Sequence, residues 1–123
     1  MPSPTSATQF RLRLYPGDFD ASRAFYADVL GYPIVEEWND GPASRGAMFD
    51  TGAGIIELLC STRIIGPARG AGVSLEVTDV ASLWERLRDA APVAYPLRHN
   101  AWGDTSFGLH DPDGFEVVFF TGD

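Results

Sequence analysis

The sequence has little of what several common protein chemistries require. Its single cysteine, Cys60, excludes an internal disulfide and a Cys-x-x-Cys pair, and we find no nucleophile elbow or phosphate-cradling glycine loop. Basic residues are few: 9 Lys and Arg against 17 Asp and Glu give a net charge of −8, which disfavours nucleic acid and anionic lipid. There is no apolar run long enough to cross a membrane, and the start MPSPTSATQ does not resemble a signal peptide. We therefore expect a cytoplasmic protein without nucleic-acid or membrane partners.

The composition is that of one ordinary domain. The chain has 123 residues, of which 45% are apolar, and this is enough to fill one core. Residues 1–8 are mostly Pro, Ser, Thr and Ala, which predicts a flexible N-terminal tail. We expect residues 9–123 to form a single folded domain.

Hydrophobic periodicity predicts the same order of elements twice. FRLRLY alternates like a half-buried strand, and PGDFDASRAFYADVLG predicts a helix that is capped by Asp18 or Asp20 and ended by Gly31. Three apolar runs separated by turns follow as strands, and the order then restarts at VSLEVT and DVASLWERLRDAA. An offset of 61 residues aligns both halves without a gap. We predict an α+β fold of two tandem βαβββ modules, at about residues 9–62 and 72–121, with a linker at about 63–71.

Four segments carry a resemblance to a known family. They are DFDASRAFYADVLGY, IIELL, TDVASLWERLRDAA and WGDTSFGLHDPDGFEVVFF, and together with their spacing they cover nearly the whole chain. In this order they resemble the vicinal oxygen chelate superfamily, which includes glyoxalases, extradiol dioxygenases and bleomycin-resistance proteins. The resemblance implies a curved mixed sheet around a cleft, usually in a homodimer.

The resemblance also implies where a metal would bind. Members that use a metal carry one ligand on the first and one on the last strand of each module, typically His or Gln and then Glu. In this chain the corresponding residues are Arg11, Glu57, Gly72 and Val118, and only Glu57 is able to bind a metal. A catalytic zinc-type site needs about three protein ligands. We therefore expect no metal and no cofactor, as in the metal-free bleomycin-resistance-like branch; a divalent metal held with other donors is the alternative.

Alternation along the strands predicts which side chains line the cleft. Phe10, Leu12 and Leu14 are expected to point toward the helices. Arg11 is expected to form an ion pair with Glu57, so that replacing it with Ala would cost about 3 kcal/mol if the pair is buried. Glu76 and Glu116 would either contact a cationic ligand or be solvated. The expected ligand-binding residues are Arg11, Arg13, Tyr15, Ile55, Glu57, Leu59, Ser74, Glu76, Trp102, Glu116, Val118 and Phe120.

Several aromatic and ionisable residues allow two interpretations. Trp102, in a loop, is expected either to stack on a flat ligand or to pack against a neighbouring subunit. His99 is a surface residue or a ligand contact, and His110, which the offset aligns with Phe49, is not expected to bind a ligand. Asp111-Pro112-Asp113-Gly114 predicts a turn. Phe25 and Trp84 are assigned to the core, Cys60 is expected to be an inert buried thiol, and Tyr32, Trp38 and Phe49 are further candidates for the pocket.

These observations predict a metal-free protein of the glyoxalase/bleomycin-resistance type that sequesters a small aromatic or cationic compound in a dimer cleft, as antibiotic-resistance proteins do. Arg11 and Arg13 would instead favour an anionic ligand. The main alternative is a metal-dependent glyoxalase-like lyase, isomerase or dioxygenase in which Glu57 is the catalytic residue. A third possibility is an accessory module whose cleft is filled by side chains.

Overall fold

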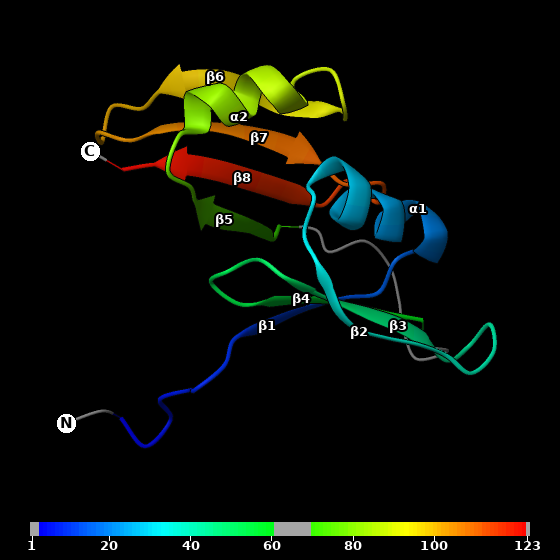
Figure 1. The fold of residues 1–123 in the computed structure, drawn as a ribbon. Helices are drawn as coiled ribbons and strands as arrows, with labels where there is room; N and C mark the ends of the chain where they lie inside the picture. Colours follow the sequence, from blue (N-terminus) through cyan, green and yellow to red (C-terminus); the bar gives the residue numbers. More distant parts are fainter. Residues whose placement is uncertain (1–2, 61–69, 123) are drawn as a thin grey trace.

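The computed structural model describes residues 3–60 and 70–122 and confirms the predicted α+β fold, with the order βαβββ occurring twice (Figure 1). Residues 1–2 of the predicted tail and most of the predicted linker lie outside the described residues. Within these ranges no helix combines the length and apolar character of a membrane span. The first module contains β1 (Arg11–Leu14), α1 (Phe19–Ala24), the π-helical turn η1 (Phe25–Val29), β2 (Ile34–Asn39), β3 (Arg45–Asp50) and β4 (Ile55–Leu59). The second contains β5 (Gly72–Glu76), α2 (Val80–Leu87), β6 (Val93–His99), β7 (Thr105–His110) and β8 (Glu116–Thr121).

Each module forms its own four-stranded mixed sheet. The strand orders are β1-β4-β3-β2 and β5-β8-β7-β6. The first strand of each module pairs in parallel with the last, whereas the other neighbours are antiparallel. A parallel pair requires a long crossover, which the helix and the two outer strands provide. In each sheet, β4 or β8 therefore lies inside the sheet, and β2 or β6 forms its outer edge.

Side chains at matching positions start the two helices. Asp18 Oδ1 accepts a hydrogen bond from the backbone N–H of Ala21, and Asp79 Oδ1 accepts one from Ser82, both at 3.1 Å. These bonds satisfy backbone donors that have no partner within the helix. Asp18, rather than Asp20, is thus the cap of the first helix. Gly31 follows that helix at a φ of 75°, in the left-handed region that glycine adopts without strain.

The gapless offset between the modules is wrong in one respect. The offset of 61 residues holds between β1 and β5 and between β4 and β8. β7, however, begins one residue earlier than this offset from β3 requires. A π-helical turn is a one-residue insertion in an α-helix, so η1 accounts for the extra residue in the first module. The turn between β7 and β8 is correspondingly one residue longer than that between β3 and β4. His110 therefore corresponds to Asp50, which pairs with Ile55 as His110 pairs with Glu116, and not to the buried Phe49.

One apolar core joins the two modules on the side of the sheets that carries the helices. Phe25 is 5% exposed, and the Trp84 ring packs 5.2 Å from that of Phe107, as expected for core residues. Cys60 is half-buried against the same core. By contrast, Phe10, which was expected to point toward the helices, precedes β1 and is 69% exposed, so it does not belong to this core.

The helix α1–η1 lies between the first sheet and the β7–β8 turn of the second module (Figure 1). Tyr26, with no exposed surface, donates a hydrogen bond from its hydroxyl to Asp111 Oδ2 at 2.8 Å. Asp111 Oδ1 accepts from the backbone N–H groups of Asp113 and Phe115, which confirms the predicted turn. The Asp113 carboxylate in turn accepts from the N–H of Gly17. The predicted turn thus also holds the modules together.

Candidate functional site

The side of the first sheet that faces away from α1 carries most of the predicted ligand-binding residues of the first module. Directly paired residues of neighbouring strands project to the same face. One row across the sheet runs from Arg13 through Glu57 and Met48 to Glu36. We call this side the first open face; it consists of Arg11, Arg13, Glu36, Trp38, Gly46, Met48, Asp50, Ile55, Glu57 and Leu59.

The second sheet has an equivalent open face. Its register places predicted residues of β5 and β8 beside residues of β7 and β6 that alternation did not identify. One row runs from Glu76 through Phe120 and Ser106 to Arg98. The second open face consists of Gly72, Ser74, Glu76, Tyr95, Arg98, Ser106, Gly108, His110, Glu116, Val118 and Phe120.

Glu57 contacts Arg13 rather than the expected Arg11. The parallel register of β1 and β4 places Arg13 opposite Glu57 and Arg11 opposite Ile55. Arg13 Nε lies 3.9 Å from Glu57 Oε1, with the two side chains 53% and 11% exposed. Arg11 instead donates from Nε to Gln9 Oε1 at 2.6 Å. The expectation of an ion pair between Arg11 and Glu57 is therefore wrong, and the condition on which the loss of about 3 kcal/mol for Arg11→Ala depended is not met.

The residues at the family's four metal-ligand positions do not fit a metal. Glu57 is the one donor among them, since Arg11 is cationic and Gly72 and Val118 have no donor side chain. Among residues 3–60 and 70–122, no group of three or more His, Cys, Asp or Glu side chains is placed to hold an ion. A cationic neighbour, Arg13, lies beside the remaining carboxylate.

An aromatic ring covers a glycine on the outer half of each open face. A Cβ atom at Gly46 would lie 2.0 Å from a ring atom of Trp38, and one at Gly108 would lie 2.9 Å from the ring of Tyr95. Each ring therefore occupies the space that a side chain on β3 or β7 would fill. Since flat rings stack well on planar ligands, both are candidate contacts. Of the other pocket candidates, Phe49 is wholly buried in the core and does not line the open face.

A polar network on β6 and β7 fixes Arg98 on the second open face. Its guanidinium carbon lies 4.0 Å from the centroid of the Tyr95 ring, and its Nε donates to Asn100 Oδ1 at 2.9 Å. Asn100 Nδ2 donates to Ser106 Oγ at 2.8 Å and to Asp104 Oδ1 at 2.7 Å. The hydroxyl groups of Tyr95 and Ser106 lie 2.9 Å apart. Regular alternation does not predict that Tyr95 and Arg98 share this face, because the register of β6 shifts between Val93 and Tyr95 and again between Tyr95 and Arg98.

The remaining candidates lie at the margins of the open faces. Trp102 is 75% exposed in the β6–β7 turn, and the Arg13 guanidinium lies 5.7 Å from the Tyr15 ring centroid. His99 Nδ1 is 3.2 Å from Thr105 Oγ1. His110 Nδ1 donates to the carbonyl of Gly114 at 3.2 Å. Tyr32 is half-buried, and burial raises its pKa to about 12.

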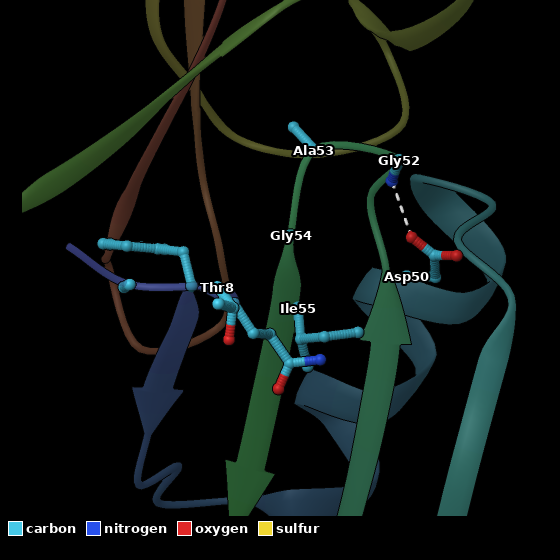
Figure 2. Close-up of a pocket in the computed structure, with 9 residues that line it drawn as sticks. Thr8, Asp50, Gly52, Ala53, Gly54 and Ile55 are labelled. Carbon is cyan, nitrogen blue, oxygen red and sulfur yellow. Dashed lines mark hydrogen bonds between the residues drawn. The ribbon is translucent and has the colours of Figure 1, made fainter. Parts of the chain in front are cut away.

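Two hollows adjoin the first open face. One, of about 570 Å³, lies between the segment that precedes β1 and the β3–β4 turn. Figure 2 shows Thr8 on one side of it and Asp50 on the other, where the Asp50 carboxylate accepts a hydrogen bond from the N–H of Gly52 at 2.7 Å. The second, of about 170 Å³, lies where β1 and β4 approach β5 and has mainly apolar walls, including Leu12 and Val73. Ile55 borders both hollows.

Comparisons with known proteins agree with this architecture. The chain is similar to the solved structure of TioX from Micromonospora sp. ML1, with 23% identity, a TM-score of 0.77 and coverage of 95% of this chain and 100% of that chain. It is similar to a lactoylglutathione lyase from Agrobacterium tumefaciens, with 25% identity, a TM-score of 0.73 and coverage of 98% and 96%. A glyoxalase/bleomycin resistance protein/dioxygenase from Nocardioides has 21% identity, a TM-score of 0.74 and coverage of 98% and 86%.

No curated protein matches the chain. The family model described as Glyoxalase/Bleomycin resistance protein/Dioxygenase superfamily, however, matches residues 8–119, which include every strand and helix except the end of β8. The sequence match and the paired βαβββ modules lead to the same result: the chain belongs to the Glyoxalase/Bleomycin resistance protein/Dioxygenase superfamily.

Proposed function

We propose that this protein binds a small organic molecule, aromatic or cationic, without a metal, in a cleft formed by two copies of the chain. The observation that carries the proposal is the set of residues at the family's metal-ligand positions. Glu57 alone retains a donor there, and Arg13 lies beside it. An Arg beside the carboxylate compensates its charge without an ion.

The composition of the two open faces supports a small-molecule site. Each face has an aromatic ring and half-buried apolar side chains, such as Leu59 on the first and Val118 and Phe120 on the second, between charged residues. Sites for small organic ligands combine mostly apolar walls with a few placed polar groups. The hydrogen bonds from Tyr26 to Asp111 and from Gly17 to Asp113 join the modules on the helix side of the sheets. A second copy of the chain is therefore the proposed cover for the open faces.

An enzyme in which Glu57 acts as a base or ligates a metal is the second candidate. Glu57 is only 8% exposed, and the similar protein from Agrobacterium tumefaciens is named as a lactoylglutathione lyase. This candidate requires donors in addition to Glu57, and it predicts that the purified protein holds a divalent metal.

Metal analysis and thermal melting separate the two candidates. We expect protein purified without chelator to hold far less than one equivalent of divalent metal. A panel of naphthalene derivatives, one cationic, one neutral and one carboxylated, should include a compound that raises the melting temperature saturably and equally with and without EDTA. One equivalent of metal that is lost in the Glu57→Gln variant would overturn the proposal, as would a panel that causes no shift. Light scattering tests the dimer, and a strict monomer would contradict the shared cleft.

A further inference from the structure

Arg98 is held in one orientation by residues that do not themselves contact solvent freely. The Tyr95 ring lies under its guanidinium, and Asn100 accepts from its Nε. Asn100 and Ser106 are only 6% and 4% exposed. They are hydrogen-bonded to each other, and Ser106 is also hydrogen-bonded to the Tyr95 hydroxyl. A long arginine side chain on an exposed strand normally samples many rotamers. Here the buried network restricts the rotamers of Arg98. A side chain held in this way loses little conformational entropy when it binds a ligand, which suits it for recognition.

The end of the Arg98 guanidinium has no partner among the described residues. Within the part of the chain that the structure describes, only its Nε is hydrogen-bonded, to Asn100 Oδ1. No carboxylate of residues 3–60 or 70–122 lies within 4.0 Å of the Arg98 guanidinium. Arg23 and Arg45, on the helix side of the first sheet, are by contrast paired with Glu37 and Asp20. The remaining Nη1 and Nη2 atoms form the planar fork that binds a carboxylate through two parallel hydrogen bonds.

Between Arg98 and β8 the second open face is mainly apolar, with Ser106 as the polar side chain on β7, and Glu76 lies beyond β8 on the opposite edge. Val118 and Phe120 project from β8, and the Tyr95 ring covers Gly108. Adjacent strands are about 4.8 Å apart, so the path from β6 to β8 is about 10 Å, which is the length of a fused two-ring system. A ligand lying on this surface would place its polar end at Arg98.

From this arrangement we propose that Arg98 is an anchor for a carboxylate and that the ligand of the second open face is an aromatic carboxylate. The inference rests on the proposed small-molecule function and narrows its ligand class. The net charge of −8 repels small acids at long range, so that selection of a carboxylate depends on this local guanidinium. Tyr95 and Asn100 act as positioning residues, and Arg98 makes the contact.

Three probes with one aromatic body test the anchor: naphthalene-2-carboxylate, its neutral carboxamide, and 2-(aminomethyl)naphthalene. In calorimetric titrations of the full chain, we expect the carboxylate to bind about tenfold more tightly than the carboxamide. Arg98→Gln should lower the affinity for the carboxylate about tenfold and so remove this preference. Arg98→Lys should retain only a small part of it, because an ammonium group lacks the planar fork.

Arg88→Gln is the matched control. Arg88 also lies over an aromatic ring, that of Trp84 at 5.5 Å, but it is at the end of α2 on the helix side. This variant makes the same change in charge and should keep the tenfold preference. A melting temperature for each variant shows that it is folded. The Nε–Hε resonance of Arg98 in the unaltered protein gives an independent readout, because it should shift with the carboxylate and much less with the carboxamide.

The outcomes distinguish this inference from the function on which it rests. If the probes bind saturably but Arg98→Gln keeps the carboxylate preference, or if the amine binds most tightly, the anchor is refuted and the binding function stands. If no probe binds saturably, both are refuted. An equal loss of preference in Arg88→Gln would show a general effect of net charge and would also refute the anchor.

Discussion

Replacing Tyr26 with phenylalanine should lower the free energy of unfolding by about 2 kcal/mol at neutral pH, because hydrogen bonds to charged groups contribute about 1.5 to 3 kcal/mol. The Tyr26 hydroxyl donates to Asp111 across the junction of the two modules at 2.8 Å. Both residues are buried, with Asp111 only 5% exposed, so water cannot replace the lost donor without rearrangement.

The loss should depend on pH with a defined sign. Burial raises the pKa of Asp111, while the hydrogen bonds from Tyr26, Phe115 and Asp113 partly oppose this effect. Because the folded pKa is above the unfolded one, the folded state binds more protons between the two values, and stability falls as pH rises through that window. Losing the Tyr26 donor raises the folded pKa further. The difference in the free energy of unfolding between Tyr26→Phe and the unaltered protein should therefore be largest above that pH window and should become small in acid.

Urea unfolding followed by tryptophan fluorescence measures this effect at neutral pH and near the ordinary aspartate pKa of about 4. Tyr32→Phe is the matched control, since among the described residues its hydroxyl makes no hydrogen bond to a side chain or backbone group. A double-mutant cycle with Asp111→Asn isolates the pairwise energy. A loss for Tyr26→Phe as small as that for Tyr32→Phe, or an equal loss at both pH values, would contradict a stabilising hydrogen bond from Tyr26 to a charged Asp111.

Two further predictions concern the first open face. Arg13→Ala should lower the free energy of unfolding by no more than about 1 kcal/mol in urea, because the Arg13 side chain is 53% exposed and water screens its contact with Glu57 at 3.9 Å, and Arg11→Ala should cost less still; a loss near 3 kcal/mol for Arg11→Ala would restore the buried pair that the register excludes. Gly46→Ala should displace the Trp38 ring, which a Cβ would approach to 2.0 Å, and shift tryptophan emission to longer wavelength; an unchanged spectrum would contradict the packing of Trp38 on Gly46.

The sequence predicted the fold and the faces of the regular strands because these follow from periodic patterns. β1 and β4, like β5 and β8, pair without a register shift, so that alternate side chains stay on one face. The starts of the helices were equally predictable from the sequence, since the N-caps Asp18 and Asp79 are local signals. The partner of Glu57 was predicted wrongly because alternation shows which face a side chain is on but does not show which residues of two neighbouring strands lie opposite each other.

The outer strands were less predictable for a different physical reason. β2 and β6 contain register shifts, and each shift moves the following side chains to the opposite face. In β6 the shift between Tyr95 and Arg98 includes Pro96, which has no N–H to donate to β7 and is tolerated on an outer strand. Tyr95 and Arg98 are three positions apart and would lie on opposite faces of a regular strand. The shift places them together.

Under the proposed function, recognition is displaced from the parallel strand pair at one edge of each sheet to the outer strand at the other edge, β2 or β6. The parallel pairs β1–β4 and β5–β8 hold the family's metal-ligand positions, where Arg11, Gly72 and Val118 now stand. The two rings that cover glycines come instead from β2 and β6, as does the anchor Arg98. A single bulged residue on β2 or β6 reverses which side chains reach the open face without disturbing the parallel pair on the other side of the sheet. The fold can therefore change its ligand through β2 and β6 while the core and the Tyr26–Asp111 junction stay intact.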